Sequence, residues 1–188
     1  MERNIRWTTW DGEGTEHLHL AVDDVAIAAD GLIVGMQAGA VFSLHYHLQC
    51  DPDWHVRSLN LQAMHGSTRK DISLLADGHG HWLQSGVSVP PLDGCLDVDI
   101  SATPFTNTLP IRRLVLQPGT SAEILVVYIS IPDLQIKPAP QRYTCLEQRS
   151  SSAGHYRYEG LTTGYTNELE VDEDGIVVDY PGLFRRVM

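Results

Sequence analysis

Residues 123–131 read EILVVYISI, and this stretch decides the fold that we expect. Successive side chains of a β-strand point to opposite faces. A run that is apolar at nearly every position therefore predicts a strand that is buried on both faces. A single open sheet cannot cover both faces of one of its own strands. We therefore expect a sheet that curls around its own layers, a short helix or a cavity.

The segments around this stretch show the alternation of half-buried strands. Residues 42–49, 96–101 and 165–172 each place apolar side chains on one face and polar side chains on the other. Five Asp-Gly pairs predict turns between strands, at residues 11–12, 30–31, 77–78, 93–94 and 174–175. Long helices are not expected, because no long window keeps an apolar period of 3.6 residues. The prediction is an all-β fold: one strongly curved antiparallel sheet that closes into a barrel-like or half-barrel form.

Two short repeats raise the possibility of an internal duplication. RSLNLQ at residues 57–62 matches RRLVLQ at 112–117, and ADGLIV at 29–34 matches EDGIVV at 173–178. Short strands also match by chance, so duplication and coincidence both stay open. The length of 188 residues predicts a single domain over residues 1–188.

The amino-acid composition limits the kinds of binding partner and cellular location that we expect. The net charge of −11 argues against nucleic acid and against docking on an anionic membrane. Three cysteines without a Cys-x-x-Cys spacing predict reduced thiols and neither a disulfide framework nor a zinc site. The N-terminus carries no apolar stretch typical of a signal peptide, and no uninterrupted apolar run is long enough to span a membrane. We expect a soluble, cytoplasmic protein with no stable membrane insertion.

The repeated R-x-L-x-L-Q pattern makes a prediction about two arginines. If both copies are strands, Arg57 and Arg112 lie on the same face as the following leucines and point inward. A buried guanidinium needs a partner, and Asp97 and Asp99 could supply one. Such an arginine would either fix strand register in an ion pair or present its charge to a phosphate, carboxylate or sugar hydroxyl.

Residues 99–119, DISATPFTNTLPIRRLVLQPG, are unusually rich in hydroxyl and amide groups between two prolines. Turns do not require this density of polar side chains. Two explanations stay open for Thr103, Thr106, Asn107 and Thr108. They could bind a hydroxyl-rich ligand at the rim of a cavity, with Arg112 and Arg113 beside them. Alternatively, Pro104 and Pro110 fix a crossover whose backbone these side chains satisfy.

Six of the nine histidines form His-x-His pairs, which on a strand project two imidazoles from one face. The segment containing His45 and His47 is spaced like the first cupin motif, but the second cupin motif is absent. A metal centre would also need a third ligand. We therefore predict no metal or other cofactor, and keep His45 and His47 as the alternative. No nucleophile elbow or Walker loop is present in the sequence.

Several long segments are distinctive, in this order along the chain: RWTTWDGEGTEHLHL, YHLQCDPDWHVRSLNL, GCLDVDISATPFTNTLPIRRL and VDEDGIVVDYPGLFRR. In these segments the chain resembles the bacterial putative glycolipid-binding family. The resemblance implies an antiparallel sheet wrapped into a barrel-like form, similar in shape to carriers that handle lipoproteins. It also implies a ligand with acyl chains and a polar headgroup. The candidate ligand-binding residues are Arg57, Arg112, Arg113, Thr103, Thr106, Asn107, Thr108, Trp54, Asp97 and Asp99.

The function that we expect is a non-enzymatic binding or carrier protein for a lipid or glycolipid held in the concave interior of the sheet. The alternative from another class is a cupin-like metal-dependent enzyme that uses His45 and His47. A third possibility is an interaction module without a small ligand, for which a filled core without cavities would be the sign. The sequence does not indicate a protein partner.

Overall fold

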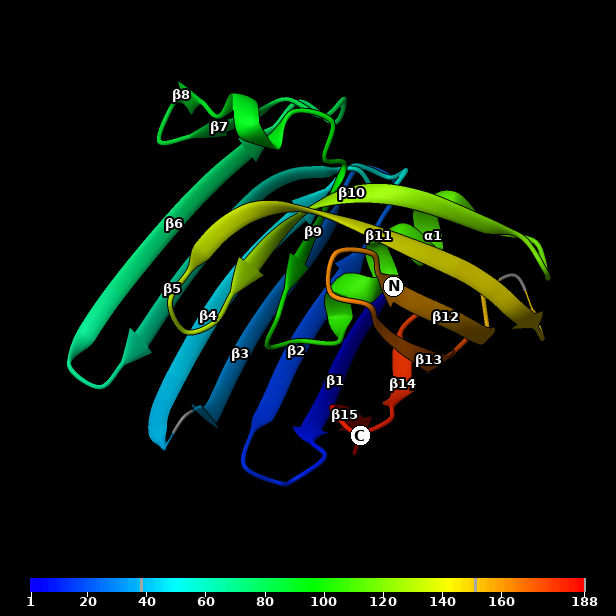
Figure 1. Cartoon of the computed structure of the whole chain (residues 1–188), viewed down its shortest axis with the longest axis horizontal. Helices are drawn as coiled ribbons and strands as arrows, with labels where there is room; N and C mark the ends of the chain where they lie inside the picture. The colour runs from blue at the N-terminus through cyan, green and yellow to red at the C-terminus, as the bar shows by residue number, and fades with distance from the viewer. Residues whose placement is uncertain (38, 151, 188) are drawn as a thin grey trace.

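The structure is a computed structural model, and it describes residues 1–37, 39–150 and 152–187. All fifteen strands belong to one curved sheet with the spatial order β8-β7-β6-β5-β4-β3-β2-β1-β15-β14-β13-β12-β11-β10-β9 (Figure 1). The strands are β1 (Glu2–Thr9), β2 (Thr15–Val22), β3 (Ile27–Gln37), β4 (Ala40–Cys50), β5 (Val56–His65), β6 (Thr68–Ala76), β7 (Trp82–Gln84), β8 (Val87–Ser88), β9 (Asp97–Ile100), β10 (Ser121–Ser130), β11 (Gln135–Gln148), β12 (Gly154–Gly160), β13 (Tyr165–Val171), β14 (Val177–Tyr180) and β15 (Phe184–Arg186). The helices are η1 (Pro90–Leu92), η2 (Phe105–Asn107) and α1 (Thr108–Leu114).

The predicted all-β, half-barrel-like fold is confirmed. The sheet curves strongly, but among the described residues no hydrogen bonds join its two ends, β8 and β9. Strand β10 contains the stretch that predicted the curl, and its consecutive residues Val126 and Val127 are both buried. Consecutive side chains face opposite sides, so the middle of β10 is covered on both faces. Among the described residues, no helix is long and apolar enough to cross a membrane.

The interior of the curve is occupied by the chain's own β9-η2-α1 segment, which Figure 1 shows in green between the N-terminal strands and the β10–β11 arm. Every residue from Thr103 to Pro110 is buried. Phe105 and Leu109 pack in the larger hydrophobic core with the N-terminal strands. Ile111 packs in a second core with β11 to β14. We call residues 101–114 the plug, because they fill much of the space that the sheet encloses.

The plug is also a crossover connection. Strand β9 pairs with β10 in parallel, whereas every other strand pair in the described sheet is antiparallel. Parallel neighbours cannot be joined by a tight hairpin, so the chain must cross over between them. The two prolines suit this path: Pro104 precedes η2 and Pro110 lies in the first turn of α1, where its missing N–H costs nothing.

The inward strand position predicted for Arg57 and Arg112 is wrong for both. The register of β4 and β5 shifts between Gln49 and Cys50, which pair with Ser58 and Val56. Arg57 is the extra residue of this bulge, and its side chain is exposed. Arg112 lies in helix α1 and not in a strand.

The repeats do not mark a structural duplication. RSLNLQ lies in β5, while RRLVLQ covers the end of α1 and the loop after it. ADGLIV lies inside β3, while EDGIVV spans the turn before β14 and part of that strand. The Asp-Gly prediction is correct at four positions and wrong at Asp30-Gly31, which lies within β3. Gly31 is there because the ring of Tyr46 packs against its backbone, where a Cβ would lie 2.1 Å from the ring.

Candidate binding groove

Three adjoining cavities form a groove along the face of the plug, and Tyr128 of β10 lines all of them. The first cavity, near the β1–β2 and β3–β4 hairpins, has a volume of about 310 Å³. The middle cavity has a volume of about 150 Å³, and the third, along β11, about 440 Å³. Ser101 and Phe184 line both the first and the middle cavity, while Tyr158 and Tyr165 line both the middle and the third. We call this space the tyrosine groove.

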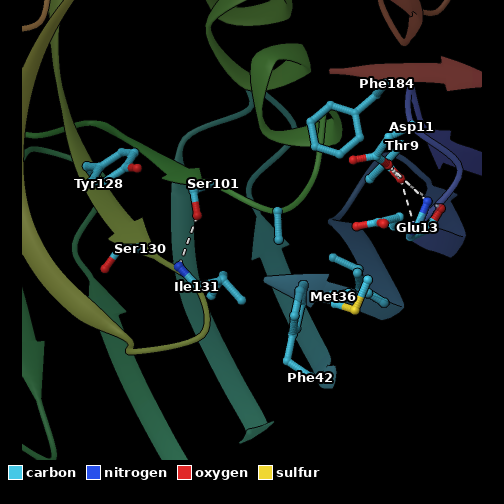
Figure 2. Close-up of a pocket in the computed structure, with 14 residues that line it drawn as sticks. Thr9, Asp11, Glu13, Met36, Phe42, Ser101, Tyr128, Ser130, Ile131 and Phe184 are labelled. Carbon is cyan, nitrogen blue, oxygen red and sulfur yellow. Dashed lines mark hydrogen bonds between the residues drawn. The ribbon is translucent and has the colours of Figure 1, made fainter. Parts of the chain in front are cut away.

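The third cavity is mainly apolar, whereas the first combines apolar side chains with the carboxylates of Asp11 and Glu13. Figure 2 shows the first cavity, with Tyr128 and Ser101 on one side, Phe184 and Thr9 on another, and Phe42 and Met36 below. The Ser101 hydroxyl accepts a hydrogen bond from the backbone N–H of Ile131 at 2.9 Å, which ties the plug to the end of β10. In the third cavity, Pro138, Ala139 and Pro140 of β11 form one wall with Tyr128, Tyr158 and Leu183. Apolar walls with a few polar groups are typical of small-molecule sites.

The middle cavity is polar, and Asp99 lies at its base. Asp99 and Tyr128 are neighbours in the parallel β9–β10 register, so both side chains point to the groove face. The Asp99 carboxylate accepts a hydrogen bond of 2.6 Å from Nε2 of Gln141. Burial raises the pKa of Asp99 to about 6, although the Gln141 hydrogen bond opposes the shift. Within the described part of the chain, no arginine, lysine or histidine pairs with this carboxylate.

Four tyrosines from the C-terminal half surround the carboxylate: Tyr128, Tyr158, Tyr165 and Tyr180 all line the middle cavity. The ring of Tyr158 lies 6.2 Å from that of Tyr165 and 6.5 Å from that of Tyr180. Burial, followed by the charge of Asp99, raises the phenol pKa of Tyr128 and Tyr158. The phenols therefore stay protonated at neutral pH and present hydroxyl donors, acceptors and aromatic faces to the groove.

Asp97 and Asp99 share one face of β9 but have different roles. Asp97 is fully buried and receives two hydrogen bonds from Arg113, at 3.2 Å from Nε and 2.5 Å from Nη2. Burial raises the pKa of Asp97 and the Arg113 interactions lower it. This ion pair joins α1 to β9, and its two charges neutralise each other. The carboxylate of Asp99, two residues further along β9, lines the middle cavity of the groove.

The plug is held behind the groove by a second buried carboxylate, Glu16 of β2. Its Oε1 accepts hydrogen bonds from the hydroxyls of Tyr46 at 2.6 Å and Thr103 at 2.8 Å. Its Oε2 is buried without a partner among the described residues. Burial raises the pKa of Glu16 to about 7, and the two hydroxyls partly oppose the shift.

The polar residues of the plug are buried, and not at an exposed rim as the ligand-binding interpretation placed them. Thr103 accepts a hydrogen bond from the N–H of Phe105, and Thr106 accepts one from the N–H of Ile100. Asn107 donates to the carbonyl of Pro104 and accepts from the hydroxyl of Tyr143. These contacts of Thr103, Thr106 and Asn107 are those that the crossover interpretation expects, whereas the Thr108 hydroxyl is buried without a partner among the described residues. Thr103 and Asn107 nevertheless line the middle cavity, whereas Thr106 and Thr108 do not.

The remaining predicted residues lie outside the groove. Arg57 donates to the carbonyl of Asp77 on the surface. Arg112 donates to the hydroxyl of Ser152 at 2.8 Å, and its guanidinium lies 5.3 Å from the ring centroid of the buried Trp54. The ten predicted residues therefore separate into an exposed arginine, an Arg112–Trp54 contact, an Arg113–Asp97 pair, the four polar residues of the plug and Asp99 of β9. Asp99, Thr103 and Asn107 alone among them line the tyrosine groove.

His45 and His47 are on the outer face of β4, away from the groove. Nε2 of His45 lies 3.1 Å from one carboxylate oxygen of Asp30, and Nδ1 of His47 lies 3.4 Å from the other. Over the described ranges, no group of three or more histidine, cysteine, aspartate or glutamate side chains is arranged to hold a metal ion. The structure gives no support to the cupin alternative.

Sequence reasoning missed Gln141 and did not single out the groove tyrosines. One signal was available: six of the seven tyrosines fall between residues 128 and 180. The pairing that brings them beside Asp99 depends on a crossover and on the curvature of the whole sheet. Neither can be obtained from local periodicity.

The fold is a curved half-barrel with a plugged interior and a groove along the plug. The chain belongs to the putative glycolipid-binding family, whose family model matches residues 4–186. It is also similar to a DUF1089 family protein from Pseudomonas aeruginosa, known from a crystal structure at 1.80 Å resolution. That likeness has a TM-score of 0.82 and 40% sequence identity, and covers 93% of this chain and 92% of the other. No curated protein matches.

Proposed function

We propose that the protein is a non-enzymatic binding or carrier protein for a lipid or glycolipid, and that the ligand occupies the tyrosine groove. The observation that carries the proposal is the arrangement of the cavities: the polar base at Asp99 adjoins the mainly apolar third cavity along β11. An amphiphile has the same division between headgroup and tail. The family description points to the same class of ligand.

The third cavity is the place proposed for the acyl chain. It is the largest of the three, and β11 contributes an apolar wall of Pro138, Ala139 and Pro140. Each methylene removed from water there contributes about 0.8 kcal/mol to binding. The position differs from the one expected at the outset, because the plug fills much of the concave interior.

The middle cavity is the place proposed for the headgroup. Asp99, Thr103 and Asn107 offer hydrogen-bonding groups there, and the tyrosine rings offer faces on which a sugar ring can stack. We place this function in the cytoplasm, in keeping with Cys50, Cys95 and Cys145, all of which are unpaired.

The proposal is tested by blocking the groove. Ala139→Trp fills the third cavity from its β11 wall, whereas Asn60→Trp places the same side chain on the exposed outer face of β5. Native mass spectrometry would identify co-purifying amphiphiles, and uptake of a fluorescent glycolipid would measure binding. We expect the wild-type protein and Asn60→Trp to bind, and Ala139→Trp to lose at least tenfold in affinity with its circular dichroism spectrum unchanged.

Two results would overturn this assignment. One is failure of the wild-type protein to take up any lipid or glycolipid. The other is equal binding by the wild-type protein and Ala139→Trp, which would place the ligand elsewhere on the molecule.

A further inference from the structure

Resting on the proposed function, we propose that Asp99 selects an uncharged, hydroxyl-bearing headgroup and rejects a phosphate, with Gln141 as the residue that positions its carboxylate. The inference concerns the chemistry of the ligand, which the family description leaves open. It follows from the charges in the groove and from an unusual hydrogen-bonding arrangement at its base.

The groove carries more negative than positive charge. Its described lining includes the carboxylates of Asp11, Glu13 and Asp99, and one cation, Lys137. Lys137 is at the third cavity, where its Nζ lies 5.5 Å from the ring centroid of Tyr128. The arginines expected to bind a phosphate lie elsewhere: Arg57 on the surface, Arg112 against Trp54 and Arg113 in its ion pair with Asp97. A phosphate in the middle cavity would therefore meet a carboxylate and no described cation.

The side chain of Gln141 is placed so that its amide holds the carboxylate of Asp99. Its side chain is 2% exposed, and Nε2 donates to Asp99 while Oε1 is buried without a partner among the described residues. Burying a carbonyl without a hydrogen-bond partner destabilises the folded state. A purely structural contact would not need a residue with this cost. The orientation of the amide holds Asp99 as a hydrogen-bond acceptor that is directed at the cavity.

The other groups at the base offer a sugar hydroxyl hydrogen bonds that a quaternary ammonium group cannot use. Tyrosine and threonine hydroxyls both donate and accept, and Asn107 carries both kinds of group. A sugar hydroxyl can complete hydrogen bonds in both directions with such neighbours. A quaternary ammonium group could use only the charge of Asp99 and the aromatic faces.

Three probes with the same eight-carbon tail test the inference: octyl β-D-glucopyranoside, octyl phosphate and octyltrimethylammonium. Calorimetric titration below the micelle concentration should show the glucoside binding at least tenfold more tightly than either charged probe. Asp99→Asn should weaken glucoside binding about tenfold and remove the discrimination against octyl phosphate. Asp71→Asn, on the exposed part of β6, provides a matched control that should change neither.

The positioning role of Gln141 has a separate readout in the pH profile. Glucoside binding should weaken as the pH falls through about 6, where Asp99 becomes protonated. Gln141→Leu removes the donor that lowers this pKa, so the same loss should occur at higher pH. The other titratable groups facing the site are Asp97, which Arg113 holds, Tyr165, Lys137 and phenols with raised pKa values at Tyr128, Tyr143, Tyr158 and Tyr180. Glu16 is connected to the site through the Thr103 hydroxyl, and its titration is common to the wild-type protein and Gln141→Leu.

The outcomes separate this inference from the proposed function. Equal or tighter binding of either charged probe, or no effect of Asp99→Asn, would overturn the headgroup inference while leaving a lipid-binding groove in place. An unchanged pH profile in Gln141→Leu would overturn the positioning role. No binding of any of the three probes would overturn both proposals.

Discussion

At the scale of single residues, buried carboxylates organise the interior. Asp97 is neutralised by Arg113, Asp99 is held by the Gln141 amide, and Glu16 accepts from two hydroxyls. The sequence indicated that Asp97 and Asp99 would share a face, because they are two residues apart in a strand. It could not indicate which of them is paired. That depends on where the helix after β9 places Arg113.

Glu16 should make the stability of the protein depend on pH. Its pKa in the folded protein is about 7, against an ordinary value of 4.5. Between these values the folded state holds a proton that the unfolded state has released, so stability falls as the pH rises through this window. A shift of this size corresponds to about 3 kcal/mol.

Glu16→Gln removes this titration and keeps a side chain that can accept from both hydroxyls. Urea unfolding at pH 5 and pH 8 should show the glutamine variant gaining stability relative to wild type as the pH rises, by up to about 3 kcal/mol. Contributions from Asp97 and Asp99 are common to both proteins and cancel. If the difference in unfolding free energy between the two proteins does not change with pH, the pKa of Glu16 is not raised by burial, and this account of Glu16 is wrong.

At the scale of elements, the strands could be predicted from the sequence, but the plug could not. Alternation predicted β4 and β13, and the doubly apolar run predicted that β10 is covered on both faces. The R-x-L-x-L-Q pattern misled because α1 ends within its second copy and a bulge interrupts the strand at Arg57 in its first. The extra residue of a bulge changes which side chains of the strand point inward. The alternation of apolar residues in the sequence does not reveal this change.

The attachment of α1 to β9 rests on the Arg113–Asp97 pair. Arg113 is 11% exposed and Asp97 is fully buried, so Arg113→Met leaves a charged group without its partner. We expect a loss of about 3–5 kcal/mol in the free energy of unfolding, measured by urea denaturation at neutral pH. Arg57→Met, which removes an exposed guanidinium, should cost less than about 1 kcal/mol. Similar losses in the two variants would contradict this role of the pair.

At the scale of the whole molecule, the curved sheet is only partly hollow. A simple carrier with an empty concavity was expected, but the plug fills much of that space and leaves a groove beside it. The groove is built from both ends of the chain and from the plug between them, so no local pattern predicts it. That residues 1–188 act as a single domain remains a prediction, in keeping with one sheet that contains every strand.

The central claim is that the ligand occupies the tyrosine groove, and the tyrosines themselves can report on it. The seven tyrosines divide into four that line the groove, Tyr143, whose ring packs against that of Tyr158 behind the groove surface, and two that lie apart from it, Tyr46 and Tyr156. NMR spectra of protein labelled with ¹³C at tyrosine, titrated with octyl β-D-glucopyranoside, measure this directly. The account predicts saturable shifts at Tyr128, Tyr158, Tyr165 and Tyr180, with Tyr46 and Tyr156 unchanged. Saturable binding without shifts at the four groove tyrosines would contradict it.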